Sequence, residues 1–193
     1  MTHETDAPTP VPDRRLAAAL AAPTATHALV FLIFGLVTVF WQEPTLTVIT
    51  VMLTAYLLAY GAASFFTSRA LLREGDDQNS QVFTSIAGIQ AGAGVLVLLL
   101  PRGEFWLTLV VCVALGLTGV LKMLAGMRTK GHNPAARDWQ LEGAIITIFA
   151  AALPVVSEIG DKAIMGTAGA GALIAGVFVM IGALTLRSAG KGV

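Results

Sequence analysis

Two charged side chains, Lys122 and Glu142, interrupt the long apolar runs of this sequence. Insertion scales put the cost of a charge in the centre of a membrane at about 3 kcal/mol, so a charge inside a span is by default a functional candidate. At about 1.5 Å per residue, both residues lie roughly 5 Å inside the expected membrane boundary. The two could form an ion pair within a helix bundle, in which Glu142 could take part in proton transfer.

A more ordinary interpretation of these charges is favoured at this point. Lys122 could extend its aliphatic stem towards the lipid headgroups, and Glu142 could be stabilised by the dipole at the start of its helix. Gln90, the deepest strongly polar side chain, could line a pathway or hydrogen-bond across a helix interface. Lys122, Glu142 and Gln90 are the candidate intramembrane polar site.

The sequence gives no support for enzymatic chemistry. It has no Ser/His/Asp grouping, no phosphate-binding loop and no His/Cys cluster at metal-binding spacing. Its three histidines, His3, His27 and His132, fall in a tail, at a helix start and in a loop. The formal net charge of zero gives no basic surface for nucleic acid. We therefore expect a non-enzymatic protein that uses no cofactor or metal and binds no nucleic acid.

The elements that must position these groups are membrane-spanning helices. The chain is 55% hydrophobic and 12% charged, whereas a soluble domain is about 25% charged. Its uncharged runs are long enough for a hydrocarbon core of roughly 30 Å. They predict six spans, at about 24–41, 45–66, 82–100, 105–126, 139–156 and 163–186. Glu142 and Pro154 shorten the fifth span, which we expect to be tilted or kinked.

The expected fold is an all-α integral membrane bundle of six transmembrane helices built from three tandem hairpins. Residues 1–23, with four prolines and three acidic residues, are expected to form a disordered cytoplasmic tail, although Asp13 could cap a short surface helix. The transmembrane domain covers 24–187, with hairpins at about 24–68, 82–127 and 139–187, and residues 188–193 form a C-terminal tail. Lys and Arg concentrate in the tails and in the loops after the second and fourth spans, which predicts that both termini are cytoplasmic.

The three hairpins share a sequence pattern that repeats every 53–58 residues or so, as parallel repeats do. A proline marks the expected turn of each hairpin, namely Pro44, Pro101 and Pro154. Each second helix carries a glycine, then an apolar stretch and a basic residue. These pairs are Gly61 with Arg69, Gly119 with Arg128, and Gly176 with Arg187.

This pattern resembles the HdeD-like family of acid-resistance membrane proteins, which is built from a short repeated two-helix domain of unknown function. The best matches are Phe40-Trp41-Gln42-Glu43-Pro44, Ala55-Tyr56, Tyr60-Gly61 and Leu141-Glu142-Gly143. The resemblance covers about residues 27–188, but repeats two and three lack the tryptophan before the turn proline. It implies a multi-pass protein of the bacterial cytoplasmic (inner) membrane that is linked to acid stress.

Small residues at helical spacing predict close packing between helices, because they let backbones approach in lipid. These residues are Ala55, Ala59 and Ala63, then Gly88 and Gly92, and finally Gly171, Ala175 and Gly176. We expect a compact bundle in the lipid bilayer, with a second copy of the chain or another membrane protein as a possible partner.

Three functions follow as hypotheses. The first is a non-enzymatic acid-stress resistance protein that acts through membrane integrity or a partner. The second is a small proton-coupled transporter or channel that uses Glu142, Lys122 and Gln90. The third is a subunit or assembly factor of a larger membrane complex.

Overall fold

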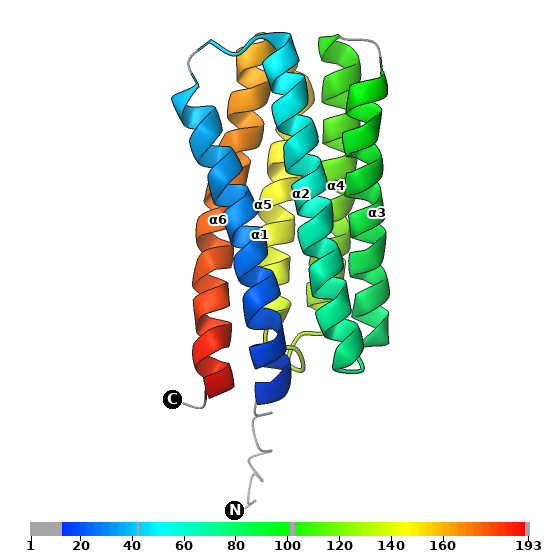
Figure 1. Ribbon diagram of the computed structural model, residues 1–193, viewed down its shortest axis with the longest axis vertical. Coiled ribbons are helices and arrows are strands. Elements are labelled where there is room, and N and C mark those ends of the chain that lie inside the picture. Colours follow the sequence, from blue (N-terminus) through cyan, green and yellow to red (C-terminus); the bar gives the residue numbers. More distant parts are fainter. Residues whose placement is uncertain (1–12, 42, 101–102, 192–193) are drawn as a thin grey trace, which may run out of the picture.

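The computed structural model describes residues 13–41, 43–100 and 103–191, and these form six helices. The helices are α1 (Arg14–Phe40), α2 (Leu46–Arg73), α3 (Asp77–Leu99), α4 (Glu104–Arg128), α5 (Ala136–Ser157) and α6 (Asp161–Lys191). Each is long and apolar enough to cross a membrane. They run alternately up and down as one bundle (Figure 1), which confirms the expected fold class.

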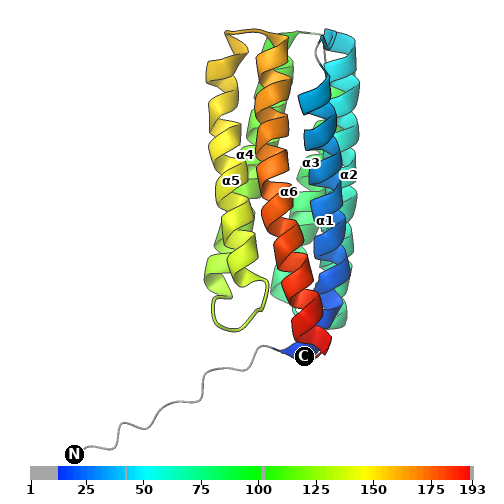
Figure 2. The ribbon, with the colours of Figure 1, turned by 90° about the vertical axis from the view of Figure 1, so that its left-hand side faces the viewer.

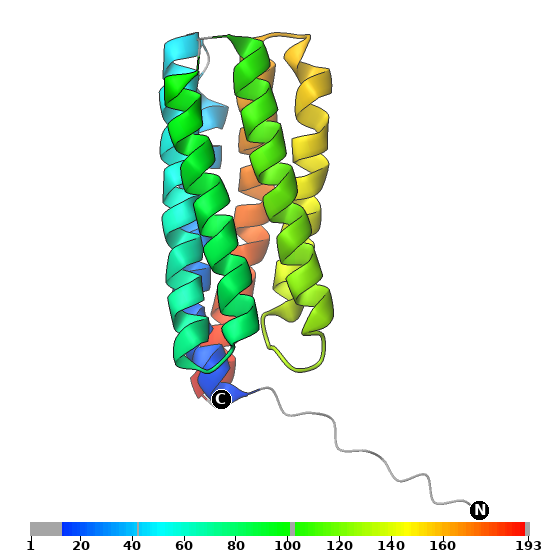
Figure 3. The ribbon, with the colours of Figure 1, turned by 90° about the vertical axis from the view of Figure 1, so that its right-hand side faces the viewer.

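The helices turn at two opposite ends of the bundle. The start of α1, the end of α6 and the α2–α3 and α4–α5 connections lie together at what we call the terminus end (Figure 3). The ends of α1, α3 and α5 and the starts of α2, α4 and α6 lie at the opposite end, which we call the far end. Both ends of the described chain therefore lie on one side of the bundle.

Close and looser helix interfaces alternate around the bundle. The closest pairs are α1 with α6, α2 with α3, and α4 with α5, while α1–α2, α3–α4 and α5–α6 pack less closely. Figure 2 shows α6 directly beside α1, so the last helix closes the ring against the first. The tightest packing thus lies between successive hairpins and not within them.

The glycines of the sequence repeat make the three closest interfaces possible. Each faces the backbone of the next helix around the ring, so that an added Cβ would collide with it. An added Cβ would lie 3.3 Å from the Ala91 nitrogen at Gly61, 2.9 Å from the Thr147 nitrogen at Gly119, and 3.0 Å from the Leu32 nitrogen at Gly176. The sequence repeat is therefore an approximate three-fold repeat in space.

The helix boundaries correct the expected tails. α1 begins at Arg14, capped by the Asp13 carboxylate, which accepts from the Arg15 and Leu16 amides. The prediction of a disordered tail is therefore wrong for residues 14–23, whereas residues 1–12 lie outside the described residues. The alanine-rich segment favours helix, and it packs on α6, where a Cβ on Gly190 would lie 2.9 Å from the Ala18 backbone. The expected C-terminal tail is likewise helical up to Lys191.

The expected turn at Pro154 is also wrong. Pro154 lies inside the last turn of α5, which continues to Ser157. Pro154 has no N–H to donate to the Ala150 carbonyl, and α5 ends within one turn of it. The turn expected around Pro101 falls partly on residues 101–102, outside the described ranges.

The predicted packing residues divide into two groups. Ala63, Gly171, Ala175 and Gly176 are buried between helices, as expected, and Ala59 is half-buried. Ala55, Gly88 and Gly92 face outwards, so they are not buried between helices of the chain, and a self-association face that includes them stays a prediction. A Cβ on Gly88 or Gly92 would meet no described atom within 4 Å, and both glycines line an apolar groove of about 450 Å³ between α3 and α4. Gly94, not these two, brings α3 against Leu58 of α2.

Candidate functional site

Lys122 and Glu142 form an ion pair inside the bundle. The Lys122 ammonium donates to Glu142 Oε1, and the two side chains are 1% and 3% exposed. Lys122 therefore does not extend to the headgroups, and the ordinary interpretation of this residue is wrong. At about 1.5 Å per residue, the pair lies roughly 9 Å inside the ends of α4 and α5.

The backbones of α4 and α5 position this pair. Gly119 lies one turn before Lys122, and Gly143 directly follows Glu142. A Cβ on Gly119 would lie 2.7 Å from the Gly143 carbonyl oxygen, so side chains larger than hydrogen would force the two helices apart. The close approach allows the lysine to reach the carboxylate within the bundle.

His27 of α1 completes a three-residue contact with this pair. Its Nδ1 lies 3.4 Å from Lys122 Nζ and 3.9 Å from Glu142 Oε1. An ammonium can only donate, so Nδ1 accepts when Lys122 is charged, and the imidazole proton is then on Nε2. The sequence placed His27 only at a helix start; the signal was its position on the same apolar helix face as Phe31 and Phe34.

Two aromatic side chains surround the Lys122 ammonium. Tyr60 of α2 places its ring centroid 5.1 Å from Nζ, and Phe83 of α3 places its own at 5.4 Å. Both distances are within the range at which an aromatic ring attracts a cation. The Tyr60 hydroxyl also donates to Glu142 Oε1 over 3.5 Å. We call His27, Tyr60, Lys122 and Glu142 the charge cluster; it joins α1, α2, α4 and α5.

Asp138 is the nearest further acid on the same helix. It lies one turn before Glu142, nearer the terminus end, and is half-buried. Its carboxylate packs against α6, where a Cβ on Gly182 would lie 2.7 Å from Asp138 Cγ. Asp138 therefore lies between the charge cluster and the terminus end of the bundle.

The charge cluster breaks the three-fold repeat at equivalent positions. The nitrogens that face the repeat glycines belong to Leu32, Ala91 and Thr147. The residues five positions before these three are His27, Ile86 and Glu142. Three positions after those glycines stand Ser64, Lys122 and Val179. All six side chains are buried. In this layer of the bundle, Lys122 of the second repeat pairs with Glu142 of the third. The equivalent positions of the other repeats hold His27, Ser64, Ile86 and Val179, which form no such ion pair with one another.

Gln90 lies in a separate polar contact. Its Nε2 donates to Thr118 Oγ1 at 2.7 Å and to the Ala114 carbonyl at 3.4 Å, both on α4. Its Oε1 has no hydrogen-bond partner among the described residues. No hydrogen bond or ion pair within these residues joins Gln90 to the charge cluster. The candidate site therefore divides into a charge cluster and a hydrogen bond between α3 and α4.

Between the charge cluster and the far end, the centre of the bundle is closely packed. Tyr56, Leu115, Ile146 and Leu153 surround a void of about 10 Å³, which is at most the space that one water needs. Within the described residues no group of three or more His, Cys, Asp or Glu side chains is placed to hold a metal ion.

The fold and the site define a class: a helical multi-pass membrane protein with a repeated two-helix unit and a buried ion pair. Residues 26–99 match the family model described as a short repeat of unknown function (DUF308), a family typical of HdeD-like membrane proteins. This segment runs from within α1 to the end of α3, so it includes His27, Tyr60 and Gln90 but neither Lys122 nor Glu142. No curated protein and no solved structure matches the chain significantly.

Proposed function

We propose that this chain is a non-enzymatic protein of the bacterial cytoplasmic membrane, of the HdeD-like acid-stress type, whose charge cluster makes the stability of the bundle depend on pH. The observation that carries this proposal is the burial of the Lys122–Glu142 pair in the contact between two closely packed helices. The short-repeat match to residues 26–99 supports the family assignment.

Acid would act on the cluster by removing one half of the ion pair. Protonation of Glu142 leaves the Lys122 ammonium buried beside a neutral acid, the His27 nitrogen and two aromatic faces, without a counter-charge. Breaking a buried pair on one side costs about 3–5 kcal/mol, because an uncompensated charge remains. The pair therefore stabilises the bundle only while both of its partners are charged. A bundle loosened in this way can change its contacts with lipid or with a partner.

The proposed orientation of the protein in the membrane follows from the distribution of its basic side chains. Exposed Arg and Lys residues gather at the terminus end, namely Arg14, Arg15, Arg69, Arg73, Arg128, Lys130, Arg137, Arg187 and Lys191. Lys162 is the basic residue described at the far end. Cytoplasmic loops carry the excess of Lys and Arg, which favours a cytoplasmic terminus end.

The test compares unfolding of the purified chain in detergent micelles at neutral pH and at about pH 4, where exposed carboxylates titrate. The comparison is between the wild type and the double variant Lys122→Met/Glu142→Gln, which keeps every surface acid. We expect the wild-type unfolding temperature to fall more than that of the double variant. An equal fall in both proteins contradicts the proposal, since surface acids would then explain the whole effect.

A proton-coupled transporter or channel is the second candidate function. It is favoured by four side chains with exchangeable protons in contact, with Asp138 one turn nearer the terminus end. The packed centre around Tyr56 and Leu115 favours the first function instead. Liposomes that contain the purified protein and a trapped pH dye separate the two. Flux in the wild type that Glu142→Gln abolishes establishes transport, whereas flux equal to that of empty liposomes supports the acid-stress function without transport.

A further inference from the structure

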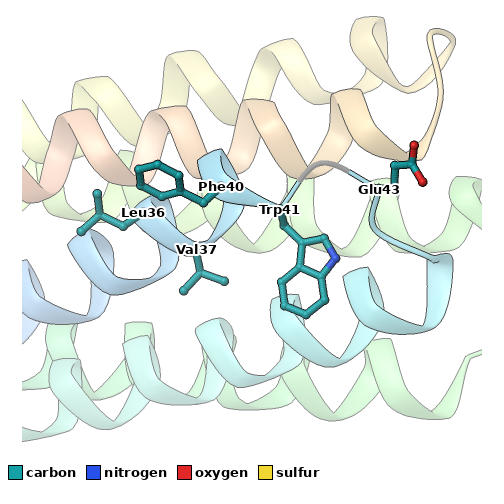
Figure 4. Close-up of a pocket in the computed structure, with 5 residues that line it drawn as sticks. All are labelled: Leu36, Val37, Phe40, Trp41 and Glu43. Atoms are coloured by element: carbon teal, nitrogen blue, oxygen red, sulfur yellow. The ribbon is translucent and has the colours of Figure 1, made fainter.

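The last turns of α1 carry apolar and aromatic side chains into a cavity at the far end of the bundle. The cavity has a volume of about 640 Å³ and is lined by Leu36, Val37, Phe40, Trp41 and Glu43. Figure 4 shows Leu36, Val37, Phe40 and Trp41 projecting from the end of α1, with Glu43 beyond them in the connection to α2. Phe40 is 77% exposed, which suits a side chain that faces hydrocarbon. The cavity therefore has an apolar part and a carboxylate at the far end.

A second cavity has the same tryptophan in its lining. It has a volume of about 230 Å³ between the far ends of α1 and α6, and Trp41 and Lys162 are among its lining residues. Glu43 and Lys162 are both exposed. Neither is in an ion pair with another side chain of the described residues. Trp41 thus lines both a cavity that contains a carboxylate and a cavity that contains a lysine.

We propose that these two cavities together bind one phospholipid whose headgroup carries a primary amine, phosphatidylethanolamine. An acyl chain lies along Leu36, Val37 and Phe40, the phosphate pairs with Lys162, and the ammonium pairs with Glu43.

The chemistry of the headgroup favours this lipid over others. Its ammonium carries three N–H donors, as a lysine does, and a carboxylate accepts charge-assisted hydrogen bonds from such donors. A choline headgroup has no N–H to donate, and Glu43 repels an anionic glycerol headgroup. The amphipathic Trp41 ring suits the headgroup level, where tryptophan is enriched in membrane proteins. A carboxylate in one cavity and a lysine in the other, with Trp41 in the lining of both, match a headgroup in which phosphate and ammonium are joined by an ethylene link.

The experiment uses the full-length chain with Trp106→Phe in nanodiscs. Because Trp139 is buried and Trp106 is absent, Trp41 is the tryptophan exposed to lipid. A tenth of the lipid in a phosphatidylcholine bilayer is replaced by an acyl-brominated lipid, whose bromines quench nearby tryptophan fluorescence. Brominated phosphatidylethanolamine, phosphatidylcholine and phosphatidylglycerol are compared at the same mole fraction.

We expect the brominated amine lipid to quench Trp41 about three-fold more effectively than the choline lipid, as a partly exposed ion pair permits. Glu43→Gln removes this preference, and Lys162→Gln lowers quenching by both zwitterionic lipids. Glu158→Gln, an exposed acid at the same end, is the matched control and leaves the preference intact. Equal quenching by the amine and choline lipids, a preference for the glycerol lipid, or a preference that survives Glu43→Gln overturns the proposal. An unaltered Lys162→Gln protein overturns it too, because the phosphate would then have no partner.

Discussion

Lys122 of α4 and Glu142 of α5 form an ion pair at the point where Gly119 and Gly143 bring their two helices into backbone contact. The position of the charges and the closeness of the helices depend on each other. A Cβ on either glycine would collide with the facing backbone and push apart the two helices that carry the pair. Without the pair, each charge would be uncompensated in an apolar interior.

The first prediction concerns the ion pair itself. Lys122→Met and Glu142→Gln should each lower the free energy of unfolding at neutral pH by about 3 kcal/mol, since each leaves the other charge buried and unpaired. The double variant should lose less than either single variant, because no charge is then left in the interior. Unfolding of the purified protein in mixed micelles measures all four corners of this cycle. Losses that simply add in the double variant would show that the two charges do not interact.

The second prediction compares glycines with and without space around them. Gly119→Ala should destabilise the bundle by about 2 kcal/mol, within the range expected for overpacking, because its Cβ would lie 2.7 Å from the Gly143 carbonyl oxygen. Gly88→Ala is the matched control, since its Cβ would meet no described atom within 4 Å. The control should be neutral or stabilising by up to about 1 kcal/mol through helix propensity. Equal effects of the two substitutions would contradict the close α4–α5 contact.

The third prediction separates the ring of Tyr60 from its hydroxyl. Tyr60→Phe should change stability by less than about 1 kcal/mol, because the hydroxyl makes one long hydrogen bond, 3.5 Å, to Glu142, and such bonds contribute little on balance. The ring that faces Lys122 remains. Tyr60→Ala should cost about 3–5 kcal/mol through the cavity it leaves. The same unfolding assay applies, and a large loss in Tyr60→Phe would assign the hydroxyl a much stronger contact.

Much of the architecture could be predicted from sequence because lipid imposes a simple length rule on uncharged runs. The six spans follow from this rule. The repeat came instead from the spacing of prolines, glycines and basic residues, and the possible pairing of Lys122 with Glu142 from their similar depth. The glycine repeat even marked the three closest interfaces, although it did not show that each glycine faces the following helix rather than its hairpin partner.

The errors arose where the spacing of residues in the sequence does not determine which side of a helix faces its neighbours. Gly88 and Gly92 have the spacing of a packing motif, yet their side of α3 faces outwards while Gly94 packs on Leu58. His27 was missed as a cluster member because its partners are far away in sequence, on α4 and α5. The sequence allowed only a short surface helix capped by Asp13, because the composition of residues 1–23 favoured disorder. In the structure, contact with α6 makes these turns part of α1.

The fourth prediction concerns the polar contact between α3 and α4. Thr118→Val should destabilise the protein more than Gln90→Leu, because it leaves the buried amide of Gln90 without its 2.7 Å partner, and an unpaired buried polar group costs about 1–3 kcal/mol. Gln90→Leu removes the amide together with its unpartnered Oε1, so its cost should stay near the 0.6 kcal/mol or so that is typical of interhelical hydrogen bonds in membranes. The reverse order would mean that Gln90 has a further partner.

The fifth prediction tests the proposed orientation. In a Cys112→Ala background, which removes the native cysteine, single cysteines replace two exposed residues, Glu74 at the terminus end and Glu158 at the far end. A membrane-impermeant maleimide applied to intact cells should label Glu158→Cys and leave Glu74→Cys unlabelled until the membrane is opened. The reason is the concentration of Arg and Lys at the terminus end, which retains that end in the cytoplasm. Labelling of Glu74→Cys in intact cells would mean that the orientation is the reverse of the proposed one, with the Glu43 and Trp41 cavity in the inner leaflet. The lipid preference of that cavity would be unchanged, because it depends on the headgroup and not on the side of the membrane.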